Sequence, residues 1–181
     1  QYDAFPQSKI NPAKQGDSDN NAVWYATGIN GTNAGAKINA AIDSLPASGG
    51  TVYAWFNGPG VETITTNFFE NIDGVSGLTT KPVTVYLGSA TFVTSDTIII
   101  PNKCRLIGSG RGYSSVEGTV IKASSDFWAG ATVVYLGGYS SAFGTRLENL
   151  TVDCSRRPMS IGILATHIQE QSGLQHVLVT N

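Results

Sequence analysis

The most site-like group of charged residues is Asp153, followed by Arg156 and Arg157, with Glu148 on the segment that leads into it. Hydrolysis of a glycosidic bond uses two carboxyl groups, one as acid and the other as base or nucleophile. Elimination at a sugar acid uses a basic side chain, often Arg or Lys, together with carboxylates or Ca²⁺. These residues are therefore the catalytic candidates. An Asx turn at Asp153 with solvated arginines is the simpler interpretation, and the one that we favour.

Alternation along residues 147–152 indicates how the candidates are presented. Leu150 and Val152 are expected to face the core. The intervening positions are then expected near the outer surface or in a turn: Glu148, Asn149, Thr151 and Asp153.

Two aromatic residues, Trp128 and Tyr139, are the candidates for binding a substrate by stacking on a sugar ring. Trp128 lies beside Gly130 in a loop-like stretch and is the better candidate for exposure. Packing in a small core is the alternative for most aromatic side chains of the chain.

The histidines and cysteines predict neither a metal site nor a cofactor site. His167 and His176 lie on different segments without a matching Cys or carboxylate pattern, so surface or turn positions are expected. Cys104 and Cys154 do not have the spacing of metal ligands. The glycine-rich stretch 108–112 is neither a Walker pattern nor a full dinucleotide fingerprint, and no helix follows it, so a tight turn is the better interpretation.

The composition narrows the choice of partners. Of 181 residues, 41% are hydrophobic and only 13% are charged, against roughly 25% in ordinary soluble domains. Glycine occurs 21 times, and Ser, Thr and Asn are frequent, which suits short strands and tight turns. The net charge is −2 with no basic cluster, so nucleic acid is not expected as a partner. No apolar run reaches the roughly 18–20 residues that span a membrane, so no membrane partner is expected either.

One amphipathic helix is predicted over residues 34–45. Asn33 is a good N-cap, and a proline and two glycines end the pattern. The apolar residues recur at helical spacing on one face: Ile38, Ala41, Ile42 and Leu45.

After Gly50 the sequence predicts short strands separated by turns. These strands are expected at 51–55, 83–87, 97–100, 105–107, 119–121, 132–136, 147–152, 161–163 and 174–179, and residues 23–25 suit a further short strand.

Two echoes favour a solenoid over a β-sandwich. Residues 147–152 resemble residues 174–179, at an offset of 27 residues that suits one coil of a β-helix, and residues 51–54 resemble 84–87. Cys104 and Cys154 then lie about two coils apart, roughly 10 Å. Because a disulfide tolerates a Cα separation of only about 7 Å, no bond between them is expected.

Several motifs follow the helix in a characteristic order: GGTVY at 49–53, SATF at 89–92, IIIP at 98–101, LIGSGRG at 106–112 and LTVD at 150–153. This order resembles the start of the pectate-lyase-like superfamily, which includes polygalacturonase-related and rhamnogalacturonase-related proteins. In that family 89–92 corresponds to a turn. The chain departs from the family in two respects: residues 56–82 are inserted, which predicts an unusual first coil, and the catalytic motifs Asn-Thr-Asp, Asp-Asp, Gly-His-Gly and Arg-Ile-Lys do not occur.

The resemblance implies an all-β fold, a right-handed parallel β-helix with an N-terminal capping α-helix. Residues 1–32 are then an irregular N-terminal segment, and residues 33–181 are the capping helix and the first coils. Since residues 174–179 read as a coil strand with no cap after it, we expect either further coils beyond Asn181 or a homo-oligomer.

The resemblance also implies the N-terminal portion of a secreted, extracellular polysaccharide hydrolase or lyase, acting on a pectin-like or glucan polymer, with the catalytic part outside this chain. The alternative is a non-enzymatic β-helix: a carbohydrate-binding, adhesin-like or phage-tailspike-type module. A polysaccharide is the expected partner in both cases. Clustered carboxylates on successive coils would favour the enzyme.

Overall fold

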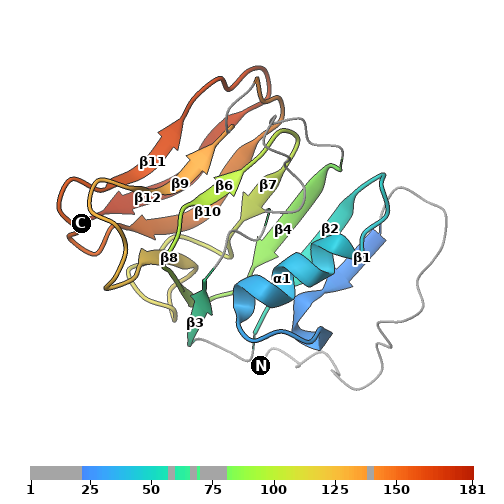
Figure 1. Ribbon diagram of the computed structural model, residues 1–181, viewed down its shortest axis with the longest axis horizontal. Helices are drawn as coiled ribbons and strands as arrows, with labels where there is room; N and C mark the ends of the chain where they lie inside the picture. Colours follow the sequence, from blue (N-terminus) through green and yellow to red (C-terminus); the bar gives the residue numbers. More distant parts are fainter. Residues whose placement is uncertain (1–21, 57–59, 66–68, 70–80, 138–140) are drawn as a thin grey trace.

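The computed structural model shows a parallel β-solenoid of about five turns with one short α-helix near its N-terminal end (Figure 1). The structure describes residues 22–56, 60–65, 69, 81–137 and 141–181. The predicted fold class is confirmed, and the predicted irregular segment 1–32 is described only from Ala22 onward.

The strands of successive coils stack in parallel on three faces. The first face holds β1 (Ala22–Tyr25), β2 (Gly50–Ala54), β4 (Val83–Leu87), β7 (Arg105–Ile107) and the first halves of β10 (Arg146–Asp153) and β12 (Gly173–Thr180). The second face holds β3 (Val61–Ile64), β5 (Thr91–Thr94), β8 (Val120–Ala123) and the second halves of β10 and β12. The third face holds β6 (Ile98–Ile100), β9 (Thr132–Leu136) and β11 (Ile161–Ala165).

The two members of each sequence echo are strands that pair with each other in neighbouring coils. Leu147 pairs with Leu174 in the parallel register of β10 and β12, which confirms the 27-residue coil. Thr51 pairs with Thr84 and Tyr53 with Tyr86 in the register of β2 and β4. Equivalent residues therefore lie directly above one another, and like side chains form rows along the solenoid.

Tyrosines make the clearest of these rows. Tyr25, Tyr53 and Tyr86 occupy one register row of β1, β2 and β4. Their rings stack with centroids 5.6 and 5.1 Å apart, and the half-exposed Trp55 meets Tyr53 edge-on at 5.3 Å. This spacing follows the strand separation of the sheet, so the row is a product of the repeat and needs no ligand to explain it.

β10 bends at Asn149, which has a left-handed backbone (φ 54°). The bend lets one strand pair with β7 on the first face and with β8 on the second. It also resets the alternation, so both Leu147 and Leu150 are fully buried. His176 occupies the same position in β12 with φ 51°.

Two residues near the bend, Thr151 and Glu148, are buried, although we expected them near the outer surface or in a turn. Thr151 is only 1% exposed because the loop between β7 and β8 covers it: its hydroxyl donates to the Gly112 carbonyl and accepts from the Gly112 N–H. Glu148 is only 7% exposed because Arg105 of the preceding coil lies against it. Alternation predicts which way a side chain points, and it does not predict what covers it.

The helix α1 (Ala34–Asp43) packs against the β1–β2 end of the stack, as Figure 1 shows. Asn33 is its N-cap, and its side chain accepts a hydrogen bond from the Ala36 N–H at 3.1 Å. Ile38 and Ile42 are buried to 1% exposure or less. The helix is two residues shorter at its C-terminal end than the predicted range 34–45, although Leu45 is still buried.

Lys81 holds the C-terminal end of α1. Its ammonium donates to the carbonyl oxygens of Ile42 and Leu45 at 2.9 Å each and reaches that of Asp43 at 3.5 Å. The last carbonyls of a helix have no partner within the helix, and a cation there also offsets the helix dipole. A residue from the entry to β4 therefore fixes the helix on the stack.

Two strands were not predicted. β3 lies inside the inserted segment 56–82, most of which lies outside the described residues. β5 includes Thr91 and Phe92, for which the resemblance implied a turn. Phe92 and Thr94 are both fully buried, and pairing with β3 and β8 on either side makes this four-residue stretch a strand.

Replacement of Ile42 by Asp tests the packing of α1. The substitution places an unpaired charge in the core, so the free energy of unfolding is expected to fall by about 4 kcal/mol in chemical denaturation. Ile42→Val is the control and is expected to cost about 1 kcal/mol. Equal denaturation midpoints for Ile42→Asp and the unaltered protein would show that α1 does not plug the stack.

Replacement of Lys81 by Met tests the hold on the C-terminal end of α1. Because three carbonyls lose a charged donor, the free energy of unfolding is expected to fall by about 1–2 kcal/mol. Lys103→Met, at an exposed lysine, is the matched control and is expected to change it by less than about 0.5 kcal/mol. The same small change in both variants would contradict the assignment.

Candidate functional site

A groove of about 510 Å³ lies at the corner where the chain passes from the second face of the solenoid to the third. Its walls come from the turns that follow β3, β5 and β8, three strands stacked in consecutive coils. The lining residues are Thr65, Ser95, Asp96, Thr97, Phe127, Trp128 and Ala131.

The turn after β8 presents Trp128 to solvent. Phe127 is 4% exposed and anchors this turn in the core, whereas its neighbour Trp128 is 80% exposed. The Phe127 N–H donates to the Ser124 carbonyl and the Ala131 N–H to the Trp128 carbonyl, so the turn is closed on both sides of the indole. The predicted exposure of Trp128 is confirmed.

The turn after β5 presents the Asp96 carboxylate. The Thr94 hydroxyl donates to the Asp96 carbonyl at 2.6 Å and accepts from the Asp96 N–H at 3.2 Å. The carboxylate oxygen Oδ1 accepts from the Thr97 N–H at 2.7 Å, and the Thr97 hydroxyl donates to the Thr132 carbonyl at 2.6 Å. These bonds fix an exposed carboxylate in place on a tight turn.

Thr65 forms the third wall of the groove, and the helix cap holds it. The Asn33 amide donates to the Thr65 hydroxyl at 3.0 Å while the other side of the same amide group caps α1. The Ser95 N–H donates to the Ile64 carbonyl at 3.2 Å, which ties this wall to the Asp96 turn.

The groove therefore combines one exposed indole, one carboxylate and several hydroxyl groups. Of the described residues that line it, Asp96 alone carries a charge. Pyranose rings have apolar faces that stack on aromatic side chains, and hydroxyl groups that hydrogen-bond to carboxylates and hydroxyls.

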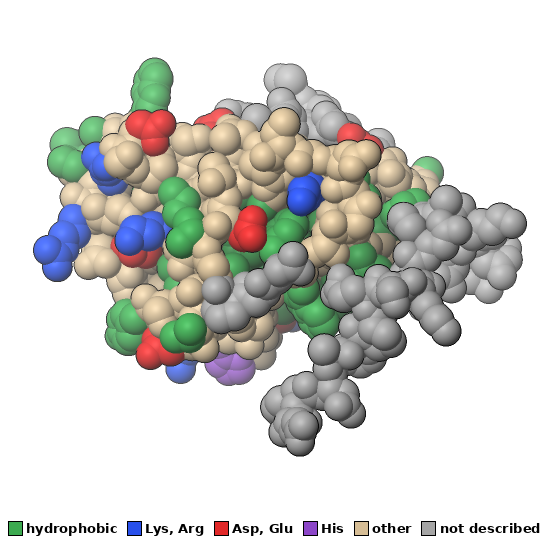
Figure 2. Space-filling model, turned by 90° about the horizontal axis from the view of Figure 1, so that it is seen from below, with side chains coloured by type: hydrophobic (Ala, Val, Ile, Leu, Met, Phe, Trp, Pro, Cys, Tyr) green, Lys and Arg blue, Asp and Glu red, His purple; other side chains and the backbone are tan. Residues whose placement is uncertain are grey.

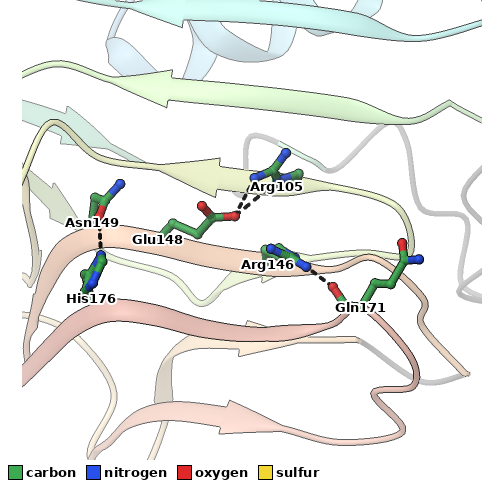
Figure 3. Close-up of polar contacts among 6 residues, drawn as sticks. All are labelled: Arg105, Arg146, Glu148, Asn149, Gln171 and His176. Atoms are coloured by element: carbon green, nitrogen blue, oxygen red, sulfur yellow. Dashed lines mark hydrogen bonds and ion pairs between the residues drawn. The ribbon is translucent and has the colours of Figure 1, made fainter.

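The predicted catalytic candidate Glu148 lies elsewhere, on the outer side of the first face. Figure 3 shows it pointing toward Arg105, whose Nη2 and Nε donate to the same carboxylate oxygen at 2.7 and 3.2 Å. Arg146, in the same view, donates through Nε to the Gln171 carbonyl. A carboxylate held by a guanidinium between two stacked strands has a structural partner already.

Asp153 forms the Asx turn that we favoured from the sequence. Its Oδ1 accepts from the Ser155 N–H at 2.8 Å and from the Asn181 amide at 2.9 Å, and its Oδ2 lies 3.7 Å from the Lys122 ammonium. Arg156 is exposed. Glu148 and Asp153 lie on different faces, each with its own cation, so the described residues do not bring them together as a pair.

The remaining candidates make no site. Tyr139 lies outside the described residues. His176 is exposed at the bend of β12 and bonds Asn149 at 3.2 Å, and His167 is exposed in a loop. Cys104 and Cys154 are both buried and are not joined by a disulfide. They lie in neighbouring coils rather than two coils apart, because β7 pairs directly with β10. Burial, with the nearby Asp153 charge, raises the pKa of Cys154. Within the part of the chain that the structure describes, no three His, Cys, Asp or Glu side chains gather to hold a metal ion.

Of the described lining residues, the sequence analysis named Trp128 and missed the others: Thr65, Ser95, Asp96, Thr97, Phe127 and Ala131. Ser95 and Asp96 read as part of an ordinary turn before the predicted strand 97–100. Only the coil register shows that this turn lies beside the one that carries Trp128.

Asp126, on the same turn as Trp128, gives a pH-dependent test of the groove's rim. The hydrogen bond from the Ser124 hydroxyl is the largest cause that lowers the pKa of Asp126 below 3.8. The backbone N–H of Asp126 and the charge of Arg157 lower it further. Ser124→Ala is therefore expected to raise the pKa of Asp126 in a carboxyl-detected NMR titration, whereas Ser125→Ala is expected to leave it unchanged.

The sign of the accompanying stability effect follows from linkage. A carboxyl whose pKa is lowered by folding contributes stability above its unfolded pKa, and the contribution is lost as the pH falls through the folded pKa. The difference in stability between Ser124→Ala and the unaltered protein is thus expected to shrink below about pH 4. A pKa of Asp126 that does not respond to Ser124→Ala would assign the shift to another group.

No helix within the described ranges is both long and apolar enough to cross a membrane. No curated protein matches the chain significantly, and no solved structure does. The sequence profile of one family, described as rhamnogalacturonase A/epimerase, pectate lyase-like, matches residues 25–181. That match covers most of the chain and agrees with the parallel solenoid, so the chain belongs to the pectate lyase-like rhamnogalacturonase A/epimerase family.

Proposed function

We propose that this chain is the polysaccharide-binding β-helix of a secreted carbohydrate-active enzyme, a hydrolase or lyase of a pectin-like or glucan polymer. The observation that carries the proposal is the groove in which the 80% exposed Trp128 faces solvent beside Asp96 and three hydroxyl side chains. A large indole left in water on a turn that backbone hydrogen bonds close on both sides suits a partner that covers it. Membership of the family supports a sugar polymer as that partner.

An extracellular location is part of the proposal, and the surface supports it. Figure 2 shows a face on which uncharged side chains and backbone cover the larger part, with fewer charged side chains among them. The frequent Ser, Thr and Asn residues of the chain can hydrogen-bond to a neutral or weakly charged polymer.

The second candidate function is binding without catalysis, as in an adhesin-like or tailspike-type module. The ion pairs of Glu148 with Arg105 and of Asp153 with Lys122 favour it, because each predicted catalytic carboxylate is already occupied. In the enzyme version of the proposal, the catalytic groups lie outside the described residues. Either version places sugar binding at the Trp128 groove.

Trp128→Ala tests the proposal. Loss of the stacking surface is expected to weaken binding to at least one polysaccharide, among pectin, rhamnogalacturonan and soluble glucans, by about 10-fold or more. Affinity electrophoresis in gels that contain each polymer measures the binding. Trp128→Phe, which keeps an aromatic face, is expected to retain most of it.

Trp55→Ala is the matched control, since Trp55 is also an exposed indole (51%) but lies outside the groove. Its migration in the gels is expected to equal that of the unaltered protein. Equal binding by Trp128→Ala and the unaltered protein, or no binding to any of the polymers, would refute the proposed site.

A further inference from the structure

We propose that the Trp128 groove is selective for an uncharged sugar unit and discriminates against a uronate. This inference rests on the proposed function and names the substrate class of the same site. On a pectin-like polymer, the groove would thus take a neutral or esterified unit; on a glucan it would take any unit.

The described lining of the groove carries a negative charge. Asp96 is the one charged side chain among the described lining residues, and its exposed carboxylate is fixed by the Thr97 N–H on a tight turn. Asp126 adds a second exposed carboxylate two positions before Trp128. Arg157, from the next coil, acts on Asp126 but does not line the groove. A sugar carboxylate in the groove therefore meets a like charge that no lining cation offsets.

Hydrogen bonding on the Asp96 side of the groove favours the same choice of ligand. An ionised carboxylate such as Asp96 can only accept, and the Thr97 hydroxyl proton is already donated to the Thr132 carbonyl. Thr65 accepts from Asn33, which leaves its own hydroxyl proton for a ligand. A uronate carboxylate needs donors, which the Thr65 and Ser95 hydroxyls and the Trp128 indole N–H can supply, whereas the turn of Asp96 and Thr97 offers acceptors. The hydroxyl groups of a neutral sugar supply donors to Asp96 and Thr97 and so match the walls.

The Trp128 indole does not by itself distinguish a neutral sugar from a uronate. Trp128 binds the ring face, which a neutral hexose and a uronic acid share. The discrimination must then come from the groups around the ring, and Asp96 is the group with the largest effect. Replacing the Asp96 carboxylate by an amide should consequently change the preference without removing the binding surface.

The test compares one acidic ligand with its uncharged counterpart. Isothermal titration calorimetry measures the full chain against oligogalacturonate, its methyl ester, and neutral gluco-, galacto- and rhamno-oligosaccharides. Binding of the methyl ester or of a neutral oligosaccharide is expected to be about 10-fold tighter than binding of oligogalacturonate, and to be lost in Trp128→Ala.

Asp96→Asn tests whether the Asp96 carboxylate sets the preference for uncharged ligands. The amide oxygen can still accept from the Thr97 N–H, so the turn is expected to persist. The affinity for oligogalacturonate is expected to rise several-fold while that for neutral ligands falls. Asp126→Asn, a carboxylate outside the groove lining, is the matched control, and its effect on the preference is expected to be smaller than that of Asp96→Asn.

Ionic strength provides a second, independent readout. Raising the salt from about 0.01 M to about 1 M shortens the screening length from roughly 30 Å to 3 Å. Screening is expected to strengthen oligogalacturonate binding by the unaltered protein and to leave neutral binding unchanged. In Asp96→Asn the salt response to oligogalacturonate is expected to shrink.

The outcomes separate this inference from the proposed function. Trp128-dependent binding of oligogalacturonate that equals or exceeds binding of its methyl ester overturns the selectivity and leaves the sugar site in place. An unchanged preference in Asp96→Asn does the same. Absence of any Trp128-dependent binding refutes both the site and its selectivity.

Discussion

Parallel, in-register stacking of coils is the constraint on which the rest of the structure depends. Each strand lies directly over its equivalent in the coil before, as Leu147 over Leu174 and Tyr53 over Tyr86 show. Backbone groups are paired between coils rather than within them, so a coil is stable only beside another coil. The turns add single bonds between coils, such as that from the Ser95 N–H to the Ile64 carbonyl, but the continuous ladders belong to the strands. The groove can therefore be built from turns of three coils without weakening the sheets that carry it.

Features that depend on local sequence could be predicted, and features that depend on stacking mostly could not. The buried face of α1 at Ile38 and Ile42, the Asx turn at Asp153 and the exposed Trp128 each follow from a few neighbouring residues. The strand β5 and the burial of Glu148 depend on adjacent coils, so periodicity alone missed them. Asp96 belongs to the same class: nothing in a polar turn reveals that a tryptophan of the next coil stands beside it.

Asn33 links the capping helix to the groove. One atom of its amide caps α1 and the other holds the Thr65 hydroxyl in the groove wall. Lys81 secures the far end of the same helix through three carbonyls. The element that closes the core thus also orients a side chain that a ligand could touch. Asn33 and Lys81 consequently couple the stability of the N-terminal end of the solenoid to the shape of the groove.

The left-handed residues at the bends, Asn149 and His176, allow a coil to turn its corner without adding a loop. The corner that carries the groove is different, because its turns vary from 95–97 after β5 to 124–131 after β8. Length can change there while every rung keeps its register. Evolution can therefore alter ligand preference at that corner by insertion or deletion, a step that in most globular domains disturbs the core. Apart from the contact of Asn33 with Thr65, the turns that form the groove and the strands that form the coils can diversify separately.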